Sequence, residues 1–312
     1  MYFGKYCFSI IFLNNAVLPP YKGSLVRGVL GDSLKNIVCA KNVVPCEQCK
    51  LRKECIYAKM FETHLFKGPP ETRQNNSPPP FVIEPPVNFK THFKKNEIFD
   101  FHLLLFGDIN LNFPYFIYAF EQLGKTGIGK NNDGKRGKFI LQSVTINDIV
   151  LYSDRTQYLK DINLLEELTI SPITENFNYE SILKISFETP LRFKVDNRLS
   201  SELSFEKLIR IMLRRISSLL TFYGKGNPDI DYKGILQRAK SIKIIDNDLS
   251  WNDWRRYSAR QKRKVNIGGL MGTIIYKGKI KEFLPFIEFC SEVHIGKQTT
   301  FGLGKFTWKI ID

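Results

Sequence analysis

The sequence lacks an apolar run long enough to cross a bilayer, which excludes a protein with membrane-spanning helices. It also lacks a convincing secretion signal. The apolar run at residues 6–13 is short, contains Ser9 and is followed by two asparagines instead of a small-residue cleavage site. That run is better explained as a first β-strand. With six cysteines and no such signal, we expect a reducing compartment and a cytoplasmic protein.

Acidic side chains are scarce relative to basic ones. The 31 Asp and Glu residues stand against 46 Lys and Arg residues, which leaves a formal net charge of +15 and a pI of about 9.4. Such an excess favours a polyanionic partner, most often a nucleic acid, although a lysine-rich soluble protein from an AT-rich genome would have a similar balance. Hydrophobic residues at 43% exclude a disordered chain, and 312 residues allow two domains.

The two halves of the chain share one order of expected elements. In the first half we expect strands at 5–14, 81–87, 98–106 and 139–146 and helices at 24–38 and 113–123. In the second half we expect strands at 182–187, 241–245, 265–276 and 306–311 and helices at 205–223, 232–239 and 283–289. Each half is βαββαβ in outline, the ferredoxin-like or RNA-recognition-motif arrangement. We therefore predict an α+β protein with tandem ferredoxin-like domains at 1–150 and 181–312, joined by a linker at 151–180.

Four cysteines lie in a short polar loop after the first expected helix, at Cys39, Cys46, Cys49 and Cys55. Thiolates clustered in this way form a tetrahedral site for zinc, and an iron–sulfur cluster is the less favoured alternative. A redox CxxC motif belongs beside a βαβ pattern, which is absent here. We predict a structural zinc, since all four positions would be protein ligands, in a loop (39–55) inserted in the N-terminal domain.

A glycine-rich basic loop precedes the last strand of each half, at 124–138 and at 294–306. The second contains Gly296, Gly302 and Gly304 together with Lys297. A turn with bare backbone N–H groups and flanking lysines suits a polyanion, so we predict that these residues bind RNA.

The first glycine loop contributes Lys130, Lys135 and Arg136 to the same predicted surface. It nearly matches a phosphate-binding P-loop, but Asn131 stands where that motif needs Ser or Thr for Mg²⁺. The order helix–loop–strand is also the reverse of a P-loop. These two departures exclude an ATPase.

The most basic run has six Lys or Arg residues between positions 255 and 264. If this run is one extended strand, alternate side chains point to one side, and neighbouring aromatic rings can stack on bases. A solvated charge run seldom brings aromatic residues with it. The residues that we predict to bind RNA here are Arg256, Tyr257, Arg260, Lys262 and Lys264.

At this point the chain resembles the CRISPR-associated endoribonucleases of the RAMP superfamily, which process precursor CRISPR RNA. The resemblance covers nearly the whole chain and is carried by residues 25–28 with the cysteine loop, 139–141, 256–261, 268–272 and 294–306. It implies tandem ferredoxin-like domains that bind the CRISPR repeat. It also implies metal-independent cleavage, in which a 2′-hydroxyl attacks the adjacent phosphate and leaves a 2′,3′-cyclic phosphate. The alternative is a non-catalytic RAMP subunit that holds CRISPR RNA among the other subunits of an effector complex.

Such a reaction needs a base, an acid and cations, and the chain has only four histidines. His294 adjoins the second glycine loop, so we favour it, although a histidine at this place can also serve only to hold the loop. Many members of the family carry a catalytic histidine near the first helix. Here that region offers Tyr21, Lys22 and Arg27, and some relatives manage with such residues. We predict these four as the catalytic set.

Overall fold

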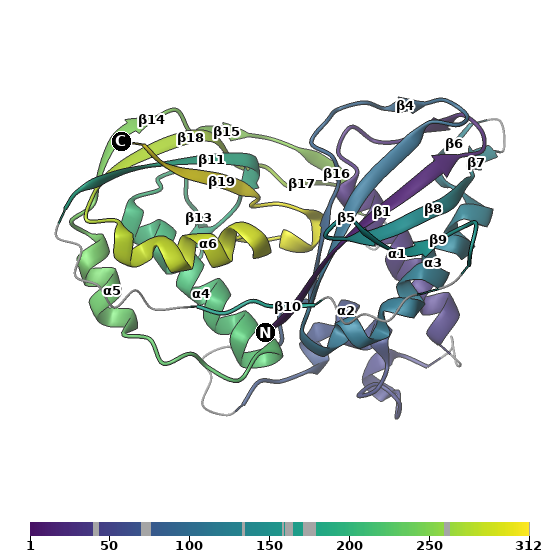
Figure 1. The fold of residues 1–312 in the computed structure, drawn as a ribbon, viewed down its shortest axis with the longest axis horizontal. Helices are drawn as coiled ribbons and strands as arrows, with labels where there is room; N and C mark the ends of the chain where they lie inside the picture. Colours follow the sequence, from purple (N-terminus) through teal and green to yellow (C-terminus); the bar gives the residue numbers. More distant parts are fainter. Residues whose placement is uncertain are drawn as a thin grey trace. The chain divides into compact units, whose positions relative to one another are not determined.

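The computed structural model describes residues 1–39, 44–69, 76–132, 135–157, 159, 165–170, 179–258 and 263–311 (Figure 1). The chain is an α+β protein that divides into two units, each built on an antiparallel sheet. The first unit is Met1–Glu167 with Phe222–Gly224, and the second is Leu168–Thr221 with Lys225–Asp312. Within these described ranges, none of the helices has the length and apolar content that a membrane crossing requires.

The first unit is a ferredoxin-like domain with additions. Its elements are β1 (Tyr2–Phe12), β2 (Ala16–Val17), α1 (Gly23–Val38), α2 (Ile56–Phe61), β3 (Phe81–Glu84), β4 (His92–Phe93), β5 (Ile98–Phe106), α3 (Phe113–Thr126), β6 (Ile128–Asn132), β7 (Lys135–Gly137), β8 (Phe139–Ile146), β9 (Ile149–Ser153) and β10 (Glu166–Glu167). The sheet order is β3-β5-β1-β8-β9, and β10 also pairs with β1. The elements β1, α1, β3, β5, α3 and β8 supply the predicted βαββαβ order. The residues expected as a linker thus include the end of β9 and all of β10.

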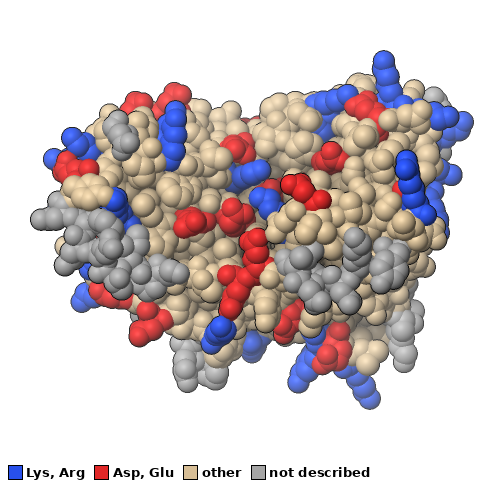
Figure 2. All heavy atoms as spheres, viewed as in Figure 1, with Lys and Arg blue, Asp and Glu red and all other residues tan. Residues whose placement is uncertain are grey.

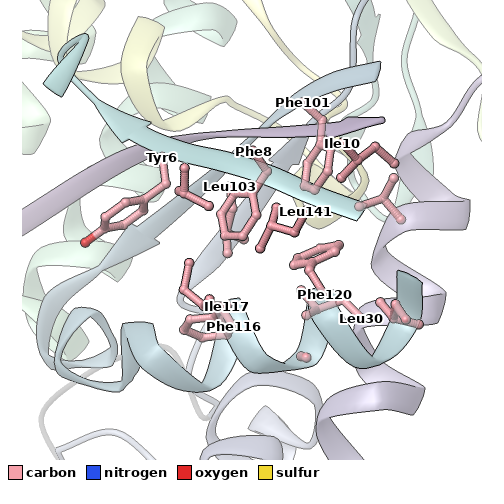
Figure 3. Close-up of a cluster of buried hydrophobic side chains, with 14 of the residues drawn as sticks. Tyr6, Phe8, Ile10, Leu30, Phe101, Leu103, Phe116, Ile117, Phe120 and Leu141 are labelled. Atoms are coloured by element: carbon pink, nitrogen blue, oxygen red, sulfur yellow. The ribbon is translucent and has the colours of Figure 1, made fainter. Parts of the chain in front are cut away.

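The core of the first unit lies between the sheet and the two helices α1 and α3 (Figure 3). Side chains alternate along β1, so that Tyr6, Phe8 and Ile10 are buried on the helix side. Phe116 and Phe120 of α3 meet them from below, one helical turn apart. The alternation of buried residues in β1 and their helical spacing in α3 are both visible in the sequence, which is why these two elements could be predicted.

The second unit repeats this plan. Its elements are β11 (Ser181–Leu191), β12 (Lys194–Val195), β13 (Arg198–Leu199), α4 (Phe205–Tyr223), α5 (Tyr232–Ala239), β14 (Lys243–Asn247), β15 (Ser250–Asn252), β16 (Arg255–Ser258), β17 (Arg263–Asn266), β18 (Gly269–Gly278), α6 (Leu284–Val293) and β19 (Phe306–Ile311). The sheet order β14-β18-β11-β19 is the same as that of β3-β5-β1-β8. Helices α4 and α6 lie on one face of this sheet (Figure 1).

The most basic run is not one extended strand, which corrects the expectation from the sequence. It is divided between β16 and β17, which pair antiparallel with Arg256 opposite Val265 and Tyr257 opposite Lys264. Positions 256 and 258 therefore lie on one strand and position 264 on its partner, so they do not belong to a single strand. Arg260 and Lys262 lie outside the described residues.

Candidate functional site

The loop at 294–306 is a tightly packed connection between α6 and β19. Its backbone N–H groups were expected to be bare, but several have acceptors within the protein. Ile295 N donates to Gly304 O at 3.1 Å, Lys297 N to Arg192 O at 2.7 Å, and Gly304 N to Pro190 O at 3.1 Å. Gly304 has φ +75°, and a Cβ at this position would lie 1.8 Å from Ile295 O. The glycine is therefore required by close backbone packing.

His294 lies inside this connection and is fully buried. Its ring Nδ1 is 3.1 Å from Leu303 O, and its own carbonyl accepts a hydrogen bond from Arg215 Nε at 3.2 Å. His294 also has a positive φ of 56°, where it ends α6. These contacts favour the alternative interpretation, in which His294 holds the loop, over a direct role in catalysis.

Two of the other predicted catalytic residues are also buried. Tyr21 is 8% exposed, and its burial, together with the charge of Glu84, raises the pKa of its phenol above the usual range. Lys22 is fully buried, and its Nζ donates to Asn88 O at 2.7 Å and to Asn88 Oδ1 at 2.8 Å. Burial, with a smaller contribution from the charge of Lys90, lowers the pKa of Lys22 to about 8. Both side chains support the fold beneath the surface.

Arg27, the fourth member of the set, is half-buried on α1, with its guanidinium carbon 5.3 Å from the centre of the Phe61 ring. Tyr21, Lys22 and Arg27 thus lie around the start of α1 in the first unit, while His294 belongs to the second unit. Within the first unit, none of the predicted catalytic residues presents a well-exposed acid or base.

A basic surface exists nonetheless on the first unit, and two asparagines hold it together. Asn14 accepts a hydrogen bond from Lys138 N at 2.8 Å and donates one to Arg136 O at 3.0 Å. These two bonds fix the β6–β7 hairpin to Asn14. The next residue, Asn15, accepts a hydrogen bond from Lys95 N at 3.1 Å, and this bond fixes the segment after β4. The two basic segments are therefore anchored on one turn.

The hairpin also packs directly against β2. Gly129 has φ +87°, and a Cβ there would lie 2.4 Å from Val17 O. Across β2 lies β4, with Val17 opposite His92. Lys and Arg side chains gather over the part of the unit that carries β4, β6 and β7 (Figure 2). We call this the ribbon surface. Its exposed basic residues are Lys90, His92, Lys94, Lys95, Lys130, Lys135, Arg136 and Lys138.

His92 is the histidine that this surface presents to solvent. Its ring is exposed, and Nδ1 is 2.9 Å from Thr91 Oγ1, an interaction that orients the imidazole. On either side in sequence stand Lys90 and Lys94, both exposed. The next residue, Phe93, is buried and makes two cation–π contacts. Lys90 Nζ lies 5.3 Å and Lys22 Nζ 5.9 Å from the centre of its ring. Lys90 is paired with Glu97, so the positive charge beside His92 comes mainly from Lys94 and Lys95. An imidazole next to such charges suits chemistry on a phosphate.

The other two histidines have surroundings that are less suited to RNA. His64 is exposed, but its ring nitrogens lie 3.6 Å from carboxylate oxygens of Glu47 and Glu62, so both nitrogens face carboxylates. His102 is half-buried in the central strand β5, opposite Cys7 of β1. His92 was missed in the sequence because β4 is only two residues long. The available signal was the spacing of two between Lys90, His92 and Lys94, which is typical of one side of an extended segment.

The residues that we predicted to bind RNA have different settings. Lys130, Lys135 and Arg136 are exposed on the β6–β7 hairpin, and Lys297 is exposed in the second unit. Gly296 is partly exposed, whereas Gly302 and Gly304 are buried. The hairpin lies between α3 and β8 and is followed by a strand, as the exclusion of a P-loop requires.

The cysteine loop forms two successive tight turns before α2. Cys49 N donates to Cys46 O at 3.2 Å, and Cys55 N donates to Leu51 O at 3.0 Å. All four cysteines of the loop are free thiols and half-buried. Burial is the main cause that raises the pKa of Cys46, and the charge of Glu62 comes second. Cys55 and Cys39 raise this pKa more weakly, so the thiols of Cys39, Cys46 and Cys55 are near one another. Across the described ranges, no three such side chains stand at metal-binding geometry. The thiol chemistry of the loop fits zinc.

Two families match this chain. Residues 1–163 match the family described as AF_1859_N, N-terminal domain, and residues 185–306 match the family described as CRISPR-associated endoribonuclease Cas6. An uncharacterized protein of Archaeoglobus fulgidus is 25% identical over 210 residues, which are 67% of this chain and 66% of that protein. The chain thus spans just under two thirds of the length of that relative.

Solved structures resemble the chain over nearly its full length. A Cas6 product complex matches with a TM-score of 0.55 at 13% identity, covering 99% of this chain and 100% of that one. Cas6 of Thermus thermophilus matches with a TM-score of 0.53 at 11% identity, covering 99% and 98%. A partial Cas6-RT-Cas1–Cas2 complex reaches 0.60 at 13% identity, but this chain covers only 46% of that one. These likenesses confirm the tandem ferredoxin-like fold.

Proposed function

We propose that this chain binds CRISPR repeat RNA and cleaves precursor CRISPR RNA. The premise is its membership: it carries the AF_1859_N N-terminal domain and belongs to the CRISPR-associated RAMP-type proteins with a Cas6 endoribonuclease domain. The fold likeness to a Cas6 product complex supports this proposal. The net charge of +15 supports an RNA partner, because an excess of lysine and arginine neutralises backbone phosphates.

The proposed reaction is an internal transesterification. The 2′-oxygen of one nucleotide attacks the adjacent phosphorus, and the bond from phosphorus to the 5′-oxygen of the next nucleotide breaks. The proton of the 2′-hydroxyl leaves to a base, and the 5′-oxygen receives a proton from an acid. The products are a 2′,3′-cyclic phosphate and a 5′-hydroxyl end. None of these steps requires a metal ion, provided that cations stabilise the negative charge on the phosphorane.

One observation carries the assignment of this chemistry to the ribbon surface. His92 is an exposed imidazole that stands between Lys90 and Lys94 in sequence, on the edge of a surface that also bears Lys130 and Lys135. The imidazole would transfer the proton, and the ammonium groups would attract the RNA and stabilise the phosphorane. We assign supporting roles to Tyr21 and Lys22, because both are buried and Lys22 lies against Phe93 of β4.

The proposed function is tested with labelled repeat RNA in buffer that contains EDTA and no added Mg²⁺. We expect cleavage at one position and a product that carries a 2′,3′-cyclic phosphate, as determined by sensitivity to phosphatase before and after acid treatment. Cleavage that requires Mg²⁺, or product with a 3′-hydroxyl, would contradict the mechanism. The zinc content of the same samples is measured, so that loss of a structural metal is not mistaken for a catalytic requirement.

A second candidate is a non-catalytic RAMP subunit that retains CRISPR RNA among other effector subunits. The burial of His294, Tyr21 and Lys22 favours it, because three of the four predicted catalytic side chains are not exposed to RNA. This candidate predicts tight binding of the repeat without any cleavage. The same assay, read together with binding by fluorescence anisotropy, therefore separates the two functions.

We also propose that the cysteine loop binds one structural zinc through Cys39, Cys46, Cys49 and Cys55. The support is the spacing of the thiols in two tight turns. Zinc bound by four thiolates would order the turns, because the loop has few buried apolar side chains of its own. It would have no part in the proposed cleavage.

Replacing Cys49 with serine is expected to remove the zinc. Purified protein should contain about one zinc per chain by mass spectrometry, and Cys49→Ser protein should contain almost none, because three thiolates hold the ion much less tightly. Cys7→Ser, a change of a half-buried cysteine outside the loop, is the matched control and should keep its zinc. Equal metal content in all three proteins would exclude this site. Visible absorption with bound iron would indicate the cluster instead.

A further inference from the structure

A hollow in the first unit has a lining of unusual charge. It occupies about 380 Å³ between the turn after the CxxC motif and the segment that follows α2. Among the described residues, its lining comprises Arg52, Lys53, Lys59 and Lys67 together with Leu65 and Phe66. Four cationic side chains around one small space repel each other, so this space attracts anions.

The anion that suits the hollow is a backbone phosphate. Lys59 pairs with Glu54 at 3.8 Å, but Glu54 is 88% exposed, so this ion pair is weak and a phosphate can replace it. Arg52 is half-buried, and its guanidinium donates to the carbonyl of Glu47 inside the CxxC turn. The position of Arg52 is therefore set by the cysteine loop itself, and this side chain is partly ordered before any ligand binds.

The apolar members of the lining indicate which kind of nucleic acid would bind. Phe66 and Leu65 are half-buried next to the cations. A combination of cations for the phosphate and an aromatic ring for a base is typical of sites for single-stranded nucleic acid. Bases in an RNA duplex are stacked and paired, so they do not reach such a ring.

We propose that this hollow binds one nucleotide of a single-stranded RNA segment outside the cleaved position, with its phosphate on the four cations and its base against Phe66. The inference rests on the proposed function only in taking RNA as the substrate. It assigns the cysteine loop a second task, as a module that extends the RNA path beyond the ribbon surface. Specificity for single-stranded flanks then comes from a part of the chain that is inserted in the ferredoxin-like domain.

The test compares two RNAs and two matched protein variants by fluorescence anisotropy. One RNA is the repeat alone, and the other is the repeat with a single-stranded extension of about ten nucleotides, a length within the range that single-strand binding sites cover. The double variant Lys53→Ala and Lys67→Ala removes two cations of the lining. The control variant Lys233→Ala and Lys240→Ala removes the same charge from two exposed positions at α5 in the second unit.

We expect wild-type protein to bind the extended RNA more tightly than the repeat alone. The Lys53 and Lys67 variant should lose about tenfold in affinity for the extended RNA and less than about twofold for the repeat alone, since it removes two of the four cations that hold the phosphate. Its plot of log affinity against log salt for the extended RNA should be shallower by up to about 0.7, since the hollow holds one phosphate. Phe66→Ala should weaken the extended complex about fivefold without a change in this slope.

The proposal would be overturned if the Lys53 and Lys67 variant lost equal affinity for both RNAs. It would also be overturned if the control variant lost as much affinity as that variant, because the cations would then act only through net charge. A wild-type protein that does not distinguish the two RNAs would overturn it as well. A failure of the proposed function has a different signature, since that protein would bind the extended RNA through the hollow but would not cleave the repeat.

Discussion

Cleavage of repeat RNA by the His92→Ala protein is expected to be about 10²- to 10⁴-fold slower than by the wild type, which is the usual contribution of a side chain that transfers a proton in the transition state. Binding should change little, because the lysines at 90, 94 and 95 remain. The measurement is the single-turnover rate at saturating protein, which separates the chemical step from RNA binding. The His92→Gln protein should be as slow as His92→Ala, because an amide forms hydrogen bonds but does not exchange protons near neutral pH.

His64→Ala is the matched control for this experiment. It also removes an exposed imidazole from the first unit, but from a place flanked by Glu47 and Glu62. We expect its cleavage rate to stay within about twofold of wild type, since surface substitutions away from a site have small effects. A His92→Ala protein that cleaves at the wild-type rate would remove His92 from the reaction. A slow His64→Ala protein would move the site towards the cysteine loop.

The His294→Ala protein is expected to lose about 3 kcal/mol of stability in the second unit. The substitution leaves a cavity at a fully buried ring and removes the partner of the Leu303 carbonyl. Unfolding in urea followed by tryptophan fluorescence isolates this effect, because Trp251, Trp254 and Trp308 are all three tryptophans of the chain and all belong to the second unit. The cleavage rate per folded molecule should stay close to that of the wild type.

Lys297→Ala provides the comparison within the same loop. Its side chain is exposed, so its removal should change the unfolding free energy by less than about 0.5 kcal/mol while it weakens RNA binding. The opposite pattern for His294→Ala, full stability with abolished cleavage, would restore His294 as a catalytic residue. Measuring both the unfolding free energy and the cleavage rate of the His294→Ala protein therefore distinguishes a histidine that holds the loop from one that takes part in catalysis.

Much of the fold could be predicted because it depends on local periodicity. The expected helix at 205–223 and strands at 98–106, 139–146 and 306–311 have the same bounds as α4, β5, β8 and β19. The alternation in β1 and the helical spacing in α3 are properties of neighbouring residues. The site could not be predicted in the same way. Whether Lys22 is buried depends on Asn88, which is 66 residues away in the sequence.

The chemistry of individual side chains was harder to predict than the segments that carry them. Histidine beside a glycine loop is a reasonable signal of function, but the packing of His294 inside a chain reversal could not be read from that signal. The basic run at 255–264 was expected as one extended strand, but its division between β16 and β17 depends on which strand pairs with which. Pairing between segments is a tertiary property that composition does not contain.

The turn at Asn14 and Asn15 has a consequence for how this surface can change during evolution. Two uncharged side chains keep the β6–β7 hairpin and the segment after β4 at a set spacing. Individual lysines on either segment can then be exchanged without disturbing the frame that carries them. The residues that fix the frame of the ribbon surface and those that set its charge are thus different sets. Selection can act on the second set while the first is maintained.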